Sequence, residues 1–525
     1  MNSADAEPRS SIVGGLRTRA DARRGQPDAD PHEQVPMQIE LNVRYPGGLT
    51  AVREAFYALW ERFGERSPAH REPQRYPGST VVPPTPPGLA LIAAKLYQSV
   101  LSRADAQQLL DTDRELARSQ DRPPTIFRIW PDYELLLQID RSAPTVKADA
   151  AWRAYAAQGQ GVVWAVVDSG IDASHPHFSA LELADEGLPG QVPHGPTSGL
   201  HGDFTYLVNP QDPQPAAVDA GGRPSALTDD SGHGTHVAGI IAGCSPTGAA
   251  PLVADSGEKR DGGYVQRAHV GTLSGMAPQC ELVSLKVVRR NRAGTWVTSS
   301  SAVIRALTYL RTEVNVDPAV LRIHGVNMSL GCVWEPEHYA AGQSPLCQAV
   351  NQTAASGVVV VVSAGNNGAQ ALNGDAGSTT AVMGSITEPA HAEDCIAVGS
   401  THRDAPHAFG ITWTSSRGPT LDGRMKPDVV APGEWITSAA AGEIRAGAGL
   451  AAAPGSPTYA EQSGTSMAAP HVSGVVAAFL SARPEFIGRP REVKAMLAAS
   501  ATDLGRERYA QGAGLVDLMR MLANA

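Results

Sequence analysis

Residues 358–368 read Val-Val-Val-Val-Val-Ser-Ala-Gly-Asn-Asn-Gly, and the five valines of this stretch decide the fold class. A strand with one face in water alternates apolar and polar residues, whereas an unbroken apolar run is typical of a strand covered on both faces. Four other short apolar runs rich in Val have the same texture, at 162–167, 282–288, 326–330 and 396–398. We therefore expect these segments to be strands of a parallel sheet.

Helix-like segments separate these runs, at 233–242, 301–311 and 348–355. Strands that alternate with helices form α/β folds, in which the crossovers place helices on both faces of the sheet. The fold class we expect is α/β, with a doubly wound, mostly parallel sheet over residues 142–525. The sequence contains no internal repeat that would favour another architecture.

The N-terminal part of the chain has a different composition. Residues 1–35 mix Arg, Asp, Ser, Gly and Pro with little to bury, which predicts disorder. We expect a small α+β domain over 36–141. It begins with strand-like alternation and continues with an amphipathic helix at 49–63. A further helical stretch over about 89–119 and an extended segment at 125–139 complete it.

Composition narrows the classes of partner. The chain has 525 residues and a formal net charge of −10, so neither nucleic acid nor an anionic membrane is expected as a main partner. No segment reaches the roughly 18 apolar residues that cross a bilayer. Five cysteines without metal-site spacing, and no visible secretory signal, indicate a reducing compartment. We therefore expect a cytoplasmic protein, with export of a trimmed form as the alternative.

Two candidate catalytic residues occur in the first half of this α/β region. Asp168 follows the apolar run at 162–167, and in an open α/β sheet the carboxyl ends of strands face the functional crevice. A turn or helix cap is the alternative for a single aspartate. His233 lies in Gly-His-Gly-Thr-His-Val-Ala-Gly at 232–239, where glycines allow close approach. A structural histidine is the alternative, and a zinc site with His236 is disfavoured because the spacing is three and no Glu lies between.

Two more candidates follow. Ser466 lies in Ser-Gly-Thr-Ser-Met-Ala-Ala-Pro-His at 463–471, at the expected start of a helix. A helix N-terminus presents free N–H groups and a dipole that favours negative charge; a plain N-cap is the alternative. Asn366 closely follows the valine run, where its amide could donate to a developing oxyanion. The Asn-Gly that comes next is also a turn signal.

The order Asp168, His233, Ser466 along the chain is the order of the triad in subtilisin. Together, five segments resemble the signature blocks of the subtilisin-like serine proteases, and this resemblance extends from about residue 144 to the C-terminus. The segments that carry it are Val-Val-Asp-Ser-Gly-Ile at 166–171, His-Gly-Thr-His-Val-Ala-Gly at 233–239, Val-Asn-Met-Ser-Leu-Gly at 326–331, Ser-Ala-Gly-Asn at 363–366 and Gly-Thr-Ser-Met-Ala-Ala-Pro-His at 464–471.

This resemblance implies a serine endopeptidase that hydrolyses peptide bonds through an acyl-enzyme. Ser466 would be the nucleophile, His233 the general base and then the general acid, and Asp168 the residue that orients the imidazole. Asn366 would form the oxyanion hole together with the backbone N–H of Ser466. A catalytically silent subtilisin-like scaffold that only binds is the alternative function.

The resemblance also implies a substrate cleft. Ser329, Leu330 and Gly331 would pair with the substrate backbone and form one wall of the S1 pocket. Glu388 and Pro389 would lie on the opposite side of that pocket. Two extensions distinguish this chain from compact members of the family, one between the proposed Asp and His and one after Cys244. Each is expected to be either an ordered surface loop or a flexible insert.

Cofactors and partners follow from the same resemblance. The triad chemistry requires no cofactor, and no metal site is predicted. Structural calcium occurs in the family, but no residue of this chain is assigned to it. The expected partners are a protein or peptide substrate and the chain's own domain 36–141. This domain resembles the family's propeptides in its position and its mixture of strands and helices, which implies an intramolecular inhibitor. A permanent accessory domain is the alternative.

Overall fold

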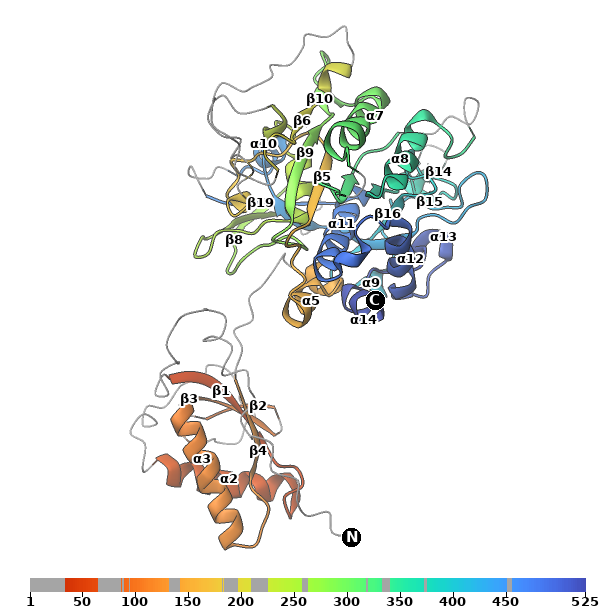
Figure 1. Cartoon of the computed structure of the whole chain (residues 1–525). Coiled ribbons are helices and arrows are strands. Elements are labelled where there is room, and N and C mark those ends of the chain that lie inside the picture. Colours follow the sequence, from red (N-terminus) through yellow and green to blue (C-terminus); the bar gives the residue numbers. More distant parts are fainter. Residues whose placement is uncertain are drawn as a thin grey trace. The chain divides into compact units, whose positions relative to one another are not determined.

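The chain folds into two compact units, Met1–Leu135 and Leu136–Ala525, which are described separately (Figure 1). The predicted disordered segment 1–35 lies outside the described residues except for its last two, which begin a strand. The extended segment predicted at 125–139 contains a strand at its start, and its second part lies outside the described residues. The computed structural model describes residues 34–64, 86, 89–93, 95–131, 142–181, 183, 197–208, 225–256, 263–317, 320–332, 340–372, 375–450 and 456–525.

The described residues of the first unit form a four-stranded antiparallel sheet and two helices. Met37, Ile39 and Leu41 alternate into one core, which they share with Phe56 and Leu109 of the helices. This confirms the predicted first strand and first helix. The strands are β1 (Gln34–Leu41), β2 (Ala90–Ala93), β3 (Leu96–Ser102) and β4 (Ile126–Pro131), in the order β2-β3-β1-β4, and the helices are α2 (Gly48–Gly64) and α3 (Arg103–Ser119).

The helix predicted over 89–119 is wrong in its first half, which forms β2 and β3. β3 pairs with β1 on one edge and with β2 on the other, and Tyr97 and Leu101 enter the core. Strand pairing and burial therefore outweighed the helical spacing. Ser102 ends β3 and caps α3 through a capping box with Asp105. This pair marks the true start of the helix, but the prediction followed the spacing of apolar residues and placed the start earlier.

The second unit contains a seven-stranded sheet in which each pair of neighbouring strands is parallel. All five predicted apolar runs contain strands, which confirms the doubly wound α/β fold class. The strand that comes first in the chain lies inside the sheet, and later strands add on both of its sides. The order across the sheet is β17 (Val429–Glu434), β16 (Ile396–His402), β13 (Val359–Ser363), β12 (Gly325–Met328), β5 (Val163–Asp168), β9 (Glu281–Lys286) and β6 (Gly202–Asp203).

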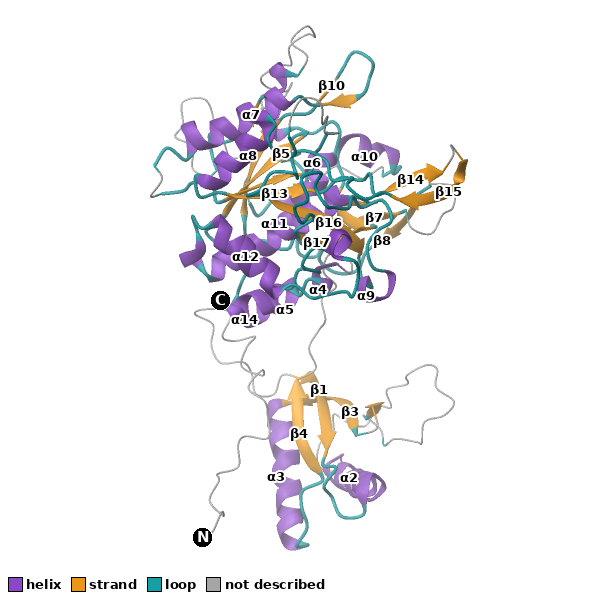
Figure 2. Cartoon of the chain, turned by 90° about the vertical axis from the view of Figure 1, so that its right-hand side faces the viewer, coloured by secondary structure: helices purple, strands orange, loops and turns teal. Residues whose placement is uncertain are grey.

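Helices cover both faces of this sheet (Figure 2). Val359 and Val361 of β13 enter one core, whereas Val358, Val360 and Val362 enter the other. This division explains the unbroken valine run, because each face needs apolar side chains. The first core includes residues of α5 (Ala148–Tyr155), α6 (His233–Ile241), α11 (Thr465–Ala482), α12 (Pro490–Ser500) and α14 (Leu518–Asn524), and the second includes residues of α7 (Ser300–Tyr309) and α8 (Pro345–Ala355).

A second sheet joins segments that are far apart in the chain. Two of its strands lie in the extension after Cys244, so this extension is at least partly ordered. The order is β18 (Ile436–Ala439), β19 (Thr458–Gln462), β7 (Leu252–Asp255) and β8 (Val265–Ala268). Further described elements include the hairpins β10 (Arg289–Arg290) with β11 (Trp296–Val297) and β14 (Ala369–Leu372) with β15 (Asp375–Ala381), and the short helices α4 (Ser142–Thr145), α9 (Pro406–Phe409), α10 (Gly442–Gly447) and α13 (Arg508–Gln511).

α11 is the central helix of this unit. This helix of 18 residues is long and apolar enough to cross a membrane, but 83% of its residues are buried inside the unit. Such burial is typical of the core helix of a globular domain. The first turn of α11 contains Ser466, which contacts Ser329 just beyond the end of β12.

Candidate active site

Three candidate residues lie at the carboxyl ends of neighbouring strands. Asp168 is the last residue of β5, Ser329 follows β12 directly, and Asn366 comes three residues after β13. These strands are adjacent in the sheet, and β5 lies where the chain has added strands in both directions. Ligands bind at such a topological switch point in open α/β sheets. The fold therefore gathers these residues at one edge of the sheet.

His233 is the first residue of α6, and its Nδ1 lies 2.8 Å from Asp168 Oδ1. The glycines on both sides permit this approach. A Cβ atom on Gly232 would lie 2.2 Å from Ala441 O, and one on Gly234 would lie 2.2 Å from Gly170 O. Gly232 also has a φ of +88°, in the left-handed region that favours glycine. Close packing around the histidine thus requires both glycines.

The Asp168 carboxylate controls the charge of the imidazole. Burial lowers the pKa of His233, but the charge and hydrogen bond of Asp168, assisted by the charge of Asp229, outweigh burial and raise the pKa above its ordinary value. Asp168 is buried, and its Oδ1 also accepts a hydrogen bond from Ser169 N at 2.8 Å. The arrangement holds His233 Nδ1–H toward the carboxylate and leaves Nε2 for another partner.

Ser466 is the second residue of α11, where backbone N–H groups have no partner within the helix. Its Oγ donates to Ser329 O at 3.2 Å, and Ser329 Oγ donates to Ser466 O at 2.8 Å. Among the described residues, Ser466 makes no hydrogen bond to His233. The structure therefore joins Asp168 directly to His233 and Ser466 directly to Ser329. Catalytic hydrogen bonds are often long without substrate and tighten only when it binds.

Asn366 lies beside the start of α11, with its amide held in one orientation. Its Oδ1 accepts hydrogen bonds from Thr465 N at 2.9 Å and Thr465 Oγ1 at 3.1 Å. The backbone N–H of Thr465 can only donate, so it places the oxygen toward Thr465 and leaves Nδ2 as a donor. Nδ2 has no hydrogen-bond partner within the described part of the chain. The residue is exposed, so this donor is accessible.

The two segments predicted to form opposite sides of an S1 pocket are hydrogen-bonded to each other. Cys332 N donates to Glu388 O at 2.9 Å, and Glu388 N donates to Cys332 O at 3.0 Å. A Cβ atom on Gly331 would lie 2.7 Å from Thr387 Oγ1, so this glycine contacts the opposite side directly. The Glu388 side chain is buried, and Leu330 packs against the second core. These contacts hold the segment 329–331 against the segment that contains Thr387 and Glu388.

Asp229 is a site residue that the sequence analysis missed. It is buried and accepts four hydrogen bonds, from Ser169 Oγ, Gly232 N, Thr235 N and Thr235 Oγ1. α6 begins after Gly232, which has no side chain to cap the helix, so Asp229 caps it from three residues earlier. The signal was present as Asp-Asp-Ser-Gly before His233, because a helix that starts on glycine needs another acceptor for its free N–H groups.

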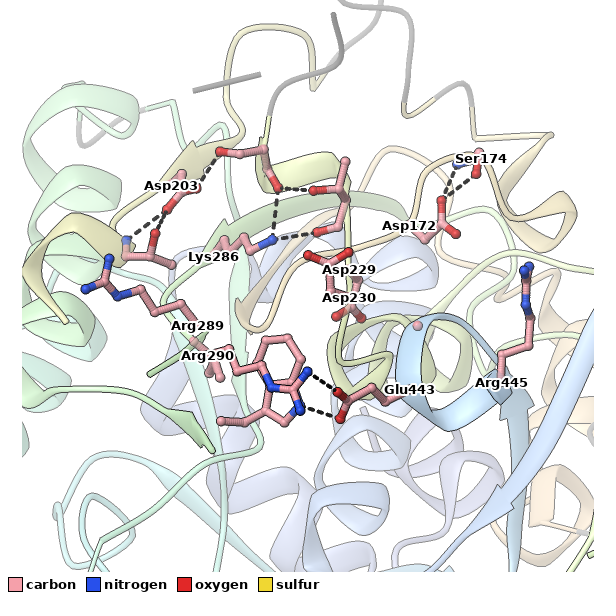
Figure 3. A pocket seen from close by; sticks show the side chains of 16 residues that line it. Asp172, Ser174, Asp203, Asp229, Asp230, Lys286, Arg289, Arg290, Glu443 and Arg445 are labelled. Carbon is pink, nitrogen blue, oxygen red and sulfur yellow. Dashed lines mark hydrogen bonds and ion pairs between the residues drawn. The ribbon is translucent and has the colours of Figure 1, made fainter. Parts of the chain in front are cut away.

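A cavity of about 690 Å³ lies beside this loop (Figure 3). Asp229 and Asp230 line it, and Ser466 and Asn366 do not. Across it, Arg290 Nη1 of β10 lies 2.9 Å from Glu443 Oε1 of α10, and Trp296 Nε1 donates to Glu443 Oε2 at 2.7 Å. The cavity therefore adjoins the histidine loop and is separate from the serine.

Metal binding receives no support from the described residues. No three His, Cys, Asp or Glu side chains among them gather in a way that could hold an ion, so calcium stays unassigned. His236, the second ligand of the disfavoured zinc site, is buried and its Nε2 contacts Ala460 O at 2.9 Å. Burial lowers the pKa of His236 to about 3. His236 is a neutral core residue of α6.

Comparisons with known proteins identify the family. The model of the subtilase family matches residues 159–515. Pyrolysin of Pyrococcus furiosus is 33% identical over 353 residues, which are 60% of this chain and 23% of pyrolysin. Subtilisin DY of Bacillus licheniformis is 29% identical over 375 residues, 71% of this chain and 95% of that protein. Serine protease AprX of Bacillus subtilis is 30% identical over 370 residues, 68% of this chain and 65% of AprX.

The predicted cytoplasmic location is wrong on this comparison, because the similar relatives include secreted extracellular subtilisins such as Subtilisin DY. All five cysteines are free. Their scarcity did not discriminate between compartments, since a domain with two large cores gains enough from burial to fold without disulfides.

The family model covers well over half of the chain, including Asp168, His233 and Ser466. The parallel sheet with helices on both faces agrees with it. This chain belongs to the subtilase family of serine endopeptidases.

Proposed function

We propose that the chain is an active endopeptidase in which Asp168, His233 and Ser466 form the catalytic triad. The observation that carries this proposal is the 2.8 Å hydrogen bond between Asp168 Oδ1 and His233 Nδ1. Such a bond holds the imidazole in the tautomer whose Nε2 accepts a proton from the nucleophile. The position of Ser466 at a helix N-terminus supports the same assignment.

In the acylation step, Ser466 Oγ attacks the carbonyl carbon of the scissile bond while His233 Nε2 takes the hydroxyl proton. The oxyanion that forms accepts hydrogen bonds from Asn366 Nδ2 and from Ser466 N–H. The C–N bond then breaks, and His233 returns the proton to the leaving amine. A water molecule, deprotonated by His233, then attacks the acyl carbon. The bond between this carbon and Ser466 Oγ breaks, and His233 returns the proton to Ser466 Oγ.

Ser466 Oγ has to turn away from Ser329 O before the first step. A neutral hydrogen bond of this kind contributes about 0.5–1.5 kcal/mol net, so its loss is a small cost for a substrate that binds along the cleft. The substrate is a protein or peptide in extended conformation. Its backbone pairs with Ser329, Leu330 and Gly331, and its side chain before the scissile bond enters between this edge and the Glu388–Pro389 side.

We also infer that the domain 36–141 acts as a propeptide-like, intramolecular inhibitor of the catalytic domain 142–525. Its place before the catalytic unit and its compact α+β fold with its own core support this role. A segment held along the substrate edge would occupy the substrate's place, so the intact chain would be slow until the domain is removed. The alternative is an accessory domain that leaves activity unchanged.

The test compares wild-type protein with Ser466→Ala and with Ser463→Ala, a matched control at an exposed serine three residues earlier. We expect Ser466→Ala to lose fluorophosphonate labelling and hydrolysis of fluorescein-labelled casein with an unchanged melting temperature, and Ser463→Ala to keep both. Wild-type protein that stays unlabelled and inactive even after cleavage between its two units would favour the silent scaffold. Intact mass measures cleavage between the two units; activity that does not rise with this cleavage would contradict the inhibitor.

A further inference from the structure

A hydrogen-bonded relay, formed by Asp229 and Ser169, connects the loop around His233 to the residue that follows Asp168. It binds the backbone N–H groups of the glycines on both sides of His233. Gly234 N donates to Ser169 Oγ at 2.9 Å, and Ser169 Oγ donates to Asp229 Oδ1 at 2.9 Å. Gly232 N donates to the same Asp229 oxygen at 2.9 Å. The relay therefore ties the histidine loop to the aspartate loop independently of the Asp168–His233 bond.

The second oxygen of Asp229 holds the first turn of α6. Thr235 N donates to Oδ2 at 2.8 Å and Thr235 Oγ1 donates to it at 2.7 Å. The Thr235 hydroxyl oxygen in turn accepts a hydrogen bond from Asp172 N at 2.9 Å. Asp229 thus contacts the helix, the loop before it and the loop after β5, and it is 5% exposed.

The partners of Asp229 favour its ionised form. Each of the four contacts is a donor, so a carboxylate satisfies all of them, whereas a protonated carboxyl would place a hydrogen against one donor. Burial raises the pKa of Asp229 above its ordinary value, and the hydrogen bonds from Thr235, Gly232 and Ser169 limit that rise without reversing it. Hydrogen bonds to the charged form stabilise it in a buried site.

The charged and titratable groups that face His233 come from three elements. Asp168 approaches from β5 and Asp229 from the loop before α6, and both favour the imidazolium. His236, on the same helix, is neutral because it is buried. Asp229 does not touch the imidazole, so it acts through the position of the loop and through its charge.

We infer that Asp229 is a positioning residue for His233: it fixes the histidine loop against the aspartate loop and places a second negative charge behind the imidazole. This inference rests on the proposed function, in which His233 is the base. Because a misplacement of about 1 Å costs roughly 10²-fold in turnover, loss of the relay should slow the chemistry by a factor of about 10–100.

The test uses the full chain as wild type, Asp229→Asn, Ser169→Ala and Asp230→Asn. The rate constant of fluorophosphonate labelling is measured from pH 5 to pH 9, and thermal unfolding is measured on the same samples. We expect Asp229→Asn to lower the rate and to move the midpoint of the pH–rate curve to lower pH. The direction follows because a negative charge raises the pKa of a histidine, so removing that charge makes the neutral base available at lower pH.

Asp230→Asn is the matched control, because it removes the same charge from the adjacent, exposed carboxylate (Figure 3). Its charge is screened by solvent, so rate and midpoint should stay at wild-type values. Ser169→Ala removes only the bridging hydroxyl, and it replaces Asp229→Asn if that variant does not fold. We expect it to lower the rate.

Two results would overturn the inference. One is a folded Asp229→Asn variant with the wild-type rate or an unmoved midpoint. The other is a folded Ser169→Ala variant with the wild-type rate. Failure of the proposed function is distinguishable, because wild-type protein and Ser466→Ala would then label equally. A purely structural role for Asp229 would lower the melting temperature and leave the midpoint in place.

Discussion

Gly234→Ala should separate His233 from Asp168 without removing a functional group. An alanine Cβ atom at this position would lie 2.2 Å from Gly170 O and 3.1 Å from Asp168 Cβ. Ordinary contact requires about 1 Å more, and Gly170 O is a backbone atom that cannot rotate away. If α6 shifts by about 1 Å, the 2.8 Å bond between His233 and Asp168 lengthens beyond hydrogen-bonding distance. A displacement of about 1 Å costs roughly 10²-fold, so we expect a loss of about that size.

The assay is the rate of fluorophosphonate labelling, with hydrolysis of fluorescein-labelled casein as a second measurement. Gly447→Ala is the matched control, because a Cβ atom there would have no neighbour within 4 Å and should change neither rate. Thermal unfolding distinguishes a displaced helix from a misfolded chain. A folded Gly234→Ala variant that labels at the wild-type rate would refute the reasoning that close packing holds the histidine in place.

Three further predictions concern the same chemistry. Asn366→Ala should lower kcat by about 10²–10³ with little change in KM. This figure is carried over from the loss of an oxyanion donor in subtilisin, a member of this family. Steady-state kinetics with an unchanged kcat would show that Asn366 is not part of the oxyanion hole. The labelling rate should rise with pH through a midpoint above the ordinary pKa of histidine. Asp168 and Asp229 raise the pKa of His233 against the effect of burial, and only the neutral imidazole is a base. A midpoint below the ordinary pKa of histidine would contradict this prediction. EDTA should leave turnover at moderate temperature unchanged, since the proposed steps use groups of the protein and water but no metal ion. Immediate inhibition that zinc reverses would favour a metal site.

The sheet of the second unit could be predicted because its strands are buried on both faces. Unbroken apolar runs rich in Val, such as 358–362, are typical of strands that are covered on both faces, and every predicted run contains a strand. β17 was missed because Val429–Glu434 includes proline, glycine and glutamate and depends on its pairing with β16. β3 was predicted as helix for a related reason: one of its two pairing partners, β1, lies more than fifty residues earlier in the chain, where no local pattern reveals it.

The candidate site could be predicted where residue type alone limits the chemistry. The sequence segments around the four catalytic candidates are rarely found in proteins with other functions; these candidates are Asp168, His233, Ser466 and Asn366. Asp229 could not be found in this way, because its role depends on four donors that only the folded loop brings together. The orientation of the Ser466 hydroxyl toward Ser329 O is likewise a matter of a single side-chain rotation, on which the sequence carries no information.

The valine run has a consequence for how accurately Asn366 is placed. A strand of identical residues has no preferred alignment of its own, because a slip by one position puts valine where valine was. Such a slip would nevertheless carry the following loop along by about 3.3 Å, the rise of one strand residue. The alignment therefore has to be enforced beyond the valines, where Ala364 N donates to Val398 O at 2.9 Å and Gly365 O accepts from Ser416 N at 2.9 Å. These two backbone contacts set the register that the identical valines leave undefined. Substitutions that disturb them should make the position of the Asn366 amide less well defined without weakening the strand.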